Sequence, residues 1–190
     1  MRTENMMIKL LTDAYIQKNL IGVTTPEIEW DELIIGYIKN INDDCIIINE
    51  IDEYGSLIGD TLIEISDILH ICIDSWYISD LYDVQDNNRI FNPNLRKTIW
   101  KEGDELKPYL QELKENGKIT RLFFDDDYFV IGIILGIDTE FCLIKNVGQN
   151  GKVDGETCYR IKDIKGLKYE DLSMQKVQFL YEKYGSTCSF

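Results

Sequence analysis

The chain has 190 residues, with 20 Lys and Arg against 34 Asp and Glu, so its formal net charge is −14 at pH 7. An apolar share of 44% is ordinary for a globular protein and excludes general disorder. No run approaches the roughly 18 apolar residues of a membrane span. The acidic balance disfavours nucleic acids and anionic membranes as partners, because both are negatively charged. The N-terminus lacks a signal-peptide pattern, so we expect a cytoplasmic protein.

In the first part of the chain, apolar residues at helical spacing predict an amphipathic helix over 3–18, with Thr3 as its N-cap. Apolar runs then predict strands over 20–24, 33–40, 45–51 and 62–73. Turns are expected at Asp43-Asp44, Tyr54-Gly55-Ser56 and Gly59-Asp60, and a break at Ser66-Asp67. A helix over 75–84 follows.

The rest of the chain repeats this order. We expect a helix over 104–115, which places Pro108 in the first turn, where proline is tolerated. The expected strands are 119–124, 130–136, 141–147 and 157–167, and the last helix is 170–183. Between the two parts, the stretch 87–98 is rich in Asn and contains Pro93, as in a linker.

An internal repeat supports this division. The stretch from Gly36 to Ile71 aligns without a gap on the stretch from Gly132 to Leu167, at an offset of 96 residues. Matching residues include Gly36 and Gly132, Ile48 and Ile144, Gly55 and Gly151, Gly59 and Gly155, and Ile65 and Ile161. A shared register of glycines and apolar residues indicates two copies of one small fold. We therefore predict an acidic first copy over 1–86, a linker over 87–98 and a second copy over 99–190.

The predicted fold class is α+β and β-rich, with two tandem copies of a helix and about five short, strongly bent strands, each ending in a helix. This order of elements resembles the Sm-like and SH3-like small β-barrels, which implies that each copy closes into a barrel. The Sm family contacts RNA through a D-x-apolar-M-N loop and an I-R-G turn. The corresponding segments here are 42–45 and 68–70, then 138–141 and 164–166. They lack the asparagine and arginine that grip a base, so no RNA site is implied.

The sequence contains few signatures of catalysis or metal binding. The five cysteines have no C-x-x-C spacing, and with His70 as the only histidine they favour structural thiols in a reducing cytoplasm over a metal site. His70 is better explained as a surface or interface residue than as a catalytic one. Asp125-Asp126-Asp127 offers oxygen ligands for Mg²⁺ or Ca²⁺, but a solvated loop is favoured because no EF-hand spacing follows. We therefore predict no catalytic residue, no metal and no cofactor.

Acidic charge is concentrated in the first half. Residues 1–98 carry 7 Lys and Arg against 18 Asp and Glu, whereas residues 99–190 carry 13 against 16. The carboxylates cluster before the second strand and in two turns, with two aromatic residues among them, and aromatic residues often anchor interfaces. A plain solubilising role is the alternative for any single cluster. The predicted partner-binding residues are Glu27, Glu29, Trp30, Asp31, Glu32, Asp43, Asp44, Glu50, Asp52, Glu53 and Tyr54.

These observations lead to three hypotheses of different classes. The first is a non-enzymatic cytoplasmic protein whose acidic face docks or neutralises a basic protein, for example an immunity protein of the bacterial toxin-immunity class that covers the substrate groove of a nuclease. The second is a structural or adaptor module that assembles into a homo-oligomer through its strand edges. The third is an enzyme with its site between the two copies.

Overall fold

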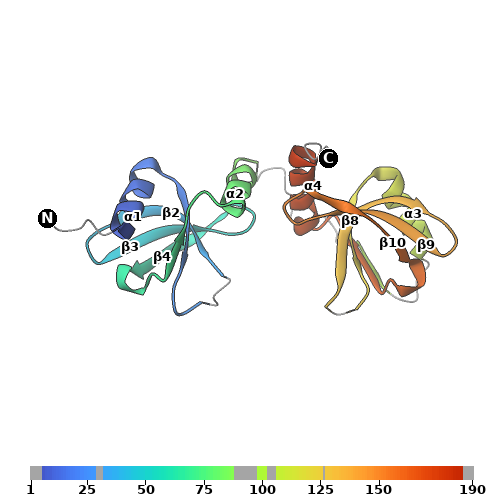
Figure 1. Ribbon diagram of the computed structural model, residues 1–190, viewed down its shortest axis with the longest axis horizontal. Coiled ribbons are helices and arrows are strands. Elements are labelled where there is room, and N and C mark those ends of the chain that lie inside the picture. The colour runs from blue at the N-terminus through green and yellow to red at the C-terminus, as the bar shows by residue number, and fades with distance from the viewer. Residues whose placement is uncertain (1–5, 29–31, 88–97, 102–105, 126, 186–190) are drawn as a thin grey trace. The chain divides into compact units, whose positions relative to one another are not determined.

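The computed structural model describes residues 6–28, 32–87, 98–101, 106–125 and 127–185 (Figure 1). The chain divides into two compact units, Met1–Asn88 and Arg89–Phe190. Each unit contains an antiparallel sheet with a helix before it and a helix after it, which confirms the predicted tandem α+β, β-rich architecture. The linker predicted over 87–98 and the N-cap predicted at Thr3 lie largely or wholly outside the described residues.

The first unit contains a five-stranded sheet of order β4-β3-β2-β1-β5. Its elements are α1 (Met6–Gln17), β1 (Leu20–Thr24), β2 (Ile34–Ile41), β3 (Cys45–Ile51), β4 (Leu57–Glu64), β5 (His70–Cys72) and α2 (Trp76–Asp86). A single 3₁₀ turn, Ile65–Asp67, joins β4 to β5. Both edge strands of the sheet are therefore consecutive in the chain.

The second unit repeats this topology and adds one strand, in the order β10-β9-β8-β7-β11-β6. Its elements are β6 (Thr98–Lys101), α3 (Leu106–Asn116), β7 (Ile119–Phe123), β8 (Phe129–Ile137), β9 (Phe141–Val147), β10 (Val153–Arg160), β11 (Gly166–Tyr169) and α4 (Leu172–Tyr184). The edge strand β6 was not predicted, because it is only four residues long and is defined by its pairing with β11, far along the chain.

In each unit, one helix packs against each face of the sheet. Successive side chains of a strand point to opposite faces, so a single strand contributes to both packing layers. In β1 all five residues are buried. Ile21 belongs to the same core cluster as Leu11 of α1, whereas Leu20 belongs to the cluster that contains Ile78 of α2. The second unit has the same pair of clusters, one beneath α3 and one beneath α4. Near-continuous apolar strands are what burial on two faces requires.

Two predictions about the strands are wrong. The sheets are not closed into barrels, because in the described residues β4 pairs only with β3, and β5 only with β1. Gly59-Asp60 is not a turn but lies inside β4, where the register shifts opposite Glu50 and Ile51. The segment predicted over 62–73 contains two strands, the end of β4 and β5, and the break predicted at Ser66-Asp67 is confirmed as the 3₁₀ turn Ile65–Asp67. The segment predicted over 157–167 is divided by the matching turn Ile161–Asp163.

The repeated glycines Gly36 and Gly132 mark places where the backbone of another segment comes too close for a side chain. A Cβ atom on Gly36 of β2 would lie 2.2 Å from the carbonyl oxygen of Asn49, and one on Gly132 of β8 would lie 2.3 Å from that of Lys145. Both distances are far inside van der Waals contact. These two glycines therefore allow β2 and β8 to bend tightly against the next strand.

Candidate functional site

All of the net charge of the protein resides in its first unit. Residues 1–88 carry 4 Lys and Arg against 18 Asp and Glu, a net charge of −14, while residues 89–190 carry 16 of each. Within the described part of the first unit the cations are Lys9, Lys18 and Lys39. Lys39 is already paired with Asp60, and its hydrogen bond lowers the pKa of that carboxyl. The first unit thus has a strongly negative surface and the second a balanced one.

The predicted acidic residues are divided between the two ends of the sheet. Asp43 and Asp44 form the turn between β2 and β3, and the Ile65 N–H donates to the Asp44 carbonyl over 2.8 Å, next to Glu64 at the end of β4. Glu53 lies in the turn at the other end of the seven-residue β3, roughly 23 Å away at about 3.3 Å per residue. The predicted carboxylates are therefore spread along the length of β3 and not gathered at one place.

Two of the predicted residues accept hydrogen bonds that stabilise the fold. The Asp52 carboxylate accepts hydrogen bonds from the N–H groups of Tyr54 (2.9 Å) and Ser56 (2.8 Å), and so builds the turn that precedes β4. The Glu50 carboxylate accepts a hydrogen bond from the Thr61 hydroxyl over 2.7 Å, which links β3 to β4. Glu29, Trp30 and Asp31 lie outside the described residues.

An acidic groove opens on the first unit between the loop after β1 and the end of β4, with a volume of about 450 Å³. Three exposed carboxylates, those of Glu27, Glu64 and Asp67, reach it from these two segments and from the 3₁₀ turn. The complete lining is Thr25, Pro26, Glu27, Ile34, Thr61, Leu62, Ile63, Glu64 and Asp67. Carboxylates beside threonine hydroxyls and an apolar floor suit a cationic side chain with an aliphatic stem.

The matching place in the second unit carries a cluster of aromatic rings. The ring centroids of Phe124 and Tyr159 lie 4.9 Å apart, and those of Phe124 and Tyr128 lie 5.5 Å apart. Arg160 stands where the first unit has the groove residue Glu64, at the repeat offset of 96, and its guanidinium lies 5.0 Å from the ring centroid of Phe141. The second copy therefore has aromatic rings and a cation where the first copy has an acidic groove.

The carboxylates of Glu64 and Asp67 were missing from the sequence-based set, although they line the groove. They lie in a segment whose apolar alternation dominates the sequence pattern. The replacement of Glu64 by Arg160 between the two copies was a usable signal, because a reversal of charge at matched positions marks a surface on which the copies have diverged. Predicted Glu27 lines the same groove, whereas Glu32 lies elsewhere, beside the start of α2.

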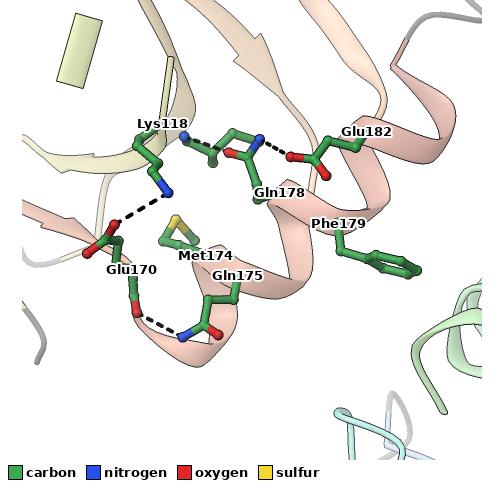
Figure 2. A pocket seen from close by; sticks show the side chains of 8 residues that line it. Lys118, Glu170, Met174, Gln175, Gln178, Phe179 and Glu182 are labelled. Carbon is green, nitrogen blue, oxygen red and sulfur yellow. Dashed lines mark hydrogen bonds and ion pairs between the residues drawn. The ribbon is translucent and has the colours of Figure 1, made fainter. Parts of the chain in front are cut away.

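A second cavity, of about 180 Å³, lies in the second unit between the start of β7 and α4 (Figure 2). Its polar groups bind one another. The Ile119 N–H donates to Gln178 Oε1 over 3.0 Å, Gln178 Nε2 donates to Glu182 over 2.8 Å, and Lys118 Nζ lies 3.4 Å from Glu170 Oε1 (Figure 2). Because its wall is internally paired, this cavity offers a ligand fewer polar contacts than the acidic groove does.

The other sequence candidates lie apart from these cavities. His70 is exposed on β5, and its Nδ1 lies 3.1 Å from the Thr24 hydroxyl. Asp125 accepts hydrogen bonds from the N–H groups of Asp127 and Tyr128, so its carboxylate shapes the loop between β7 and β8. Burial raises the pKa of the Cys142 thiol to about 11, which keeps it protonated at neutral pH. Cys188 is outside the described residues.

Within the described ranges, no helix is long and apolar enough to cross a membrane, and His, Cys, Asp and Glu side chains form no group of three or more that would suit a metal ion. Comparison with protein-family models, with curated proteins and with solved structures gives no match to this chain.

Proposed function

We propose that this protein is a non-enzymatic binding protein whose first unit docks a basic partner protein at the acidic groove. The observation that carries the proposal is the contrast between the two copies. The first unit holds the whole net charge of −14 and an open groove with three carboxylates, whereas the second has no net charge and carries the aromatic residues Phe124, Tyr128 and Tyr159 at the matching place.

Two ranges of electrostatic attraction act in this mechanism. The field of the whole unit speeds the approach of a positively charged partner, and this part weakens with salt because exposed charges are screened. The groove then acts at short range, where Glu27, Glu64 and Asp67 accept hydrogen bonds from Lys or Arg. A concrete form of this function is neutralisation of a nuclease toxin in the cytoplasm, in which the carboxylates take the positions of substrate phosphates.

Self-assembly is the second candidate function, and the edge strand β4 favours it. Leu57, Ile58 and Leu62 on this strand are 65%, 59% and 63% exposed. β4 pairs with β3 on one side only among the described residues. An edge strand with unpaired backbone groups and exposed apolar side chains is a template for pairing with another chain. In that case the acidic surface would keep the resulting assembly soluble.

The first candidate is tested by affinity capture from native cell extract, followed by kinetics with the purified captured protein. A variant that carries Glu27→Gln and Glu64→Gln removes two groove charges. Its matched control carries Asp13→Asn and Asp86→Asn, which removes two exposed charges elsewhere in the same unit. We expect capture of a basic protein at low salt, with a larger loss of affinity in the groove variant than in the control. Equal losses in the two variants would contradict docking at the groove.

A further inference from the structure

Gly22 of β1 and Arg121 of β7 occupy the same place in the two sheets. Each lies between the same two neighbouring strands and pairs with residues that are related by the repeat offset of 96. These partners are Ile35 and Cys72 for Gly22, and Ile131 and Lys168 for Arg121. The second unit therefore carries an arginine where the first carries no side chain at all.

In the second unit the arginine lies across the sheet face that α4 covers. Its Cζ atom is 4.7 Å from the centroid of the Phe129 ring, in the geometry of a cation–π contact. Its terminal nitrogen donates a hydrogen bond to the Ser173 hydroxyl of α4 over 3.0 Å. An aromatic ring and a helix side chain thus hold the guanidinium from two sides.

The first unit has a hollow at the matching place, with a volume of about 540 Å³. We call it the Trp76 hollow, and its lining residues are Glu32, Leu33, Ile35, Trp76 and Tyr77. Leu33 and Tyr77 are the repeat counterparts of the Phe129 and Ser173 that hold Arg121. A Cβ atom on Gly22 would lie 3.1 Å from Leu33 Cδ1, so a side chain at this position would point toward the wall of the hollow.

The lining of the Trp76 hollow has the chemistry of a guanidinium site. The Trp76 side chain is 62% exposed and packs edge-on against Tyr77, with 5.8 Å between their centroids. Indole is the aromatic ring that attracts cations most strongly. The exposed Glu32 supplies a carboxylate, and burial together with the charge of nearby Glu53 raises the pKa of Tyr77. A planar guanidinium can stack on a ring and bind a carboxylate in a bidentate manner, which an ammonium group cannot.

We propose that the Trp76 hollow receives an arginine side chain of the basic partner, in the place that Arg121 fills within the second unit. This inference rests on the proposed function, since it names the anchor residue of the same partner. The Trp76 hollow of the first copy would then bind an arginine of another protein, whereas Arg121 of the second copy occupies the matching place. The acidic groove attracts positive charge in general, and the hollow selects arginine over lysine.

The test uses the full chain and two synthetic peptides of 12 residues, one alternating Arg with Ser and the other alternating Lys with Ser. Both are titrated by calorimetry and by NMR, in which the Trp76 indole N–H reports on the hollow. We expect the arginine peptide to bind about threefold to tenfold more tightly, the range that one cation–π contact provides. Trp76→Ala should reduce its affinity to that of the lysine peptide.

A matched pair of substitutions at Gly22 tests whether an arginine of this chain can occupy the hollow in place of the partner's arginine. Gly22→Arg supplies the side chain that the second unit has, and we expect it to remove the preference for arginine. Gly22→Ala adds only a Cβ atom next to the flexible Leu33 side chain and should retain that preference. If the Gly22→Arg chain does not fold, the exposed Trp76 still allows the Trp76→Ala test.

The outcomes separate this inference from the proposed function. Equal affinity for the two peptides, or a preference that survives both Trp76→Ala and Gly22→Arg, would overturn the hollow as an arginine site. The salt-sensitive binding of both peptides would then still agree with electrostatic docking. If neither peptide binds at low salt, the proposed function fails and this inference fails with it.

Discussion

Tyr82 and Gln178 occupy matching positions on α2 and α4, and each accepts a hydrogen bond from the backbone N–H that opens a matching strand, β1 in the first unit and β7 in the second. The donor is Leu20 in the first unit and Ile119 in the second. Both N–H groups belong to fully or almost fully buried residues. A phenol and an amide thus play the same structural role, because each satisfies a strand terminus and fixes the C-terminal helix against it.

Loss of this acceptor should destabilise the unit in which it lies. Gln178→Leu leaves the Ile119 N–H buried without a partner, at a cost of about 1–3 kcal/mol. Glu182→Ala is the control, because it removes the other hydrogen-bond partner of Gln178 but keeps the bond from Ile119. Denaturant unfolding measures the free energy, and hydrogen exchange of the Ile119 amide locates the effect. Unchanged exchange at this amide in Gln178→Leu would show that another group satisfies it.

The bend in β8 predicts a second effect on stability. Gly132→Ala places a Cβ atom 2.3 Å from the carbonyl oxygen of Lys145, so the backbone of one strand must move. We expect a loss of about 1–3 kcal/mol or more, as for other overpacked sites. Gly136→Ala in the same strand is the matched control, because its Cβ atom would meet only Leu143 at 3.7 Å. Equal thermal unfolding of the two variants would refute the role of Gly132.

Most of the secondary structure could be predicted because the core residues are strongly patterned. β1, β3 and β9 coincide with apolar runs, since burial on two faces leaves few polar positions in these strands. The ends of the sheets were harder to predict. β6 depends on pairing with β11, and β4 begins at Leu57, so it runs through the turn expected at Gly59-Asp60. Local pattern carries no information about such distant partners.

The candidate site was only partly accessible from the sequence for a related reason. Clusters of carboxylates such as Asp43-Asp44 are visible in the sequence, but a groove depends on which side chains are absent as well as on which are present. The Trp76 hollow lies in the unit that has Gly22 where the other has Arg121, and the register that relates these two residues comes from strand pairing. The repeat offset of 96 does not relate these two residues, because the loop between β1 and β2 has nine residues and that between β7 and β8 has five.

The N-cap of α4 predicts a dependence of stability on pH. Burial acts to raise the pKa of Asp171, but hydrogen bonds from Lys168 Nζ (2.8 Å) and the Met174 N–H (2.8 Å) outweigh it, and the net pKa is lowered. The resulting stabilisation is present above pH about 4, the pKa of an unfolded aspartate, and is lost as the pH falls through the lower pKa of the folded state.

The variant Asp171→Asn isolates this charge, because asparagine is also a good N-cap and does not titrate. The wild type should be more stable than the variant at pH 7, and the difference should shrink toward pH 2. Urea unfolding at a series of pH values measures both curves. A difference that stays constant over this range would mean that the contribution of Asp171 is independent of its charge.

The exposed edge of β4 allows self-assembly to be separated from docking. Leu62 lines the acidic groove, whereas Ile58 is on the same strand but outside it. Ile58→Lys places a charge on the exposed edge and should disrupt strand pairing between copies while sparing the groove. Sedimentation velocity over a range of concentrations measures the effect. If the wild type forms an oligomer that Ile58→Lys converts to a monomer, assembly through β4 is supported. A wild type that remains monomeric throughout contradicts self-assembly through β4.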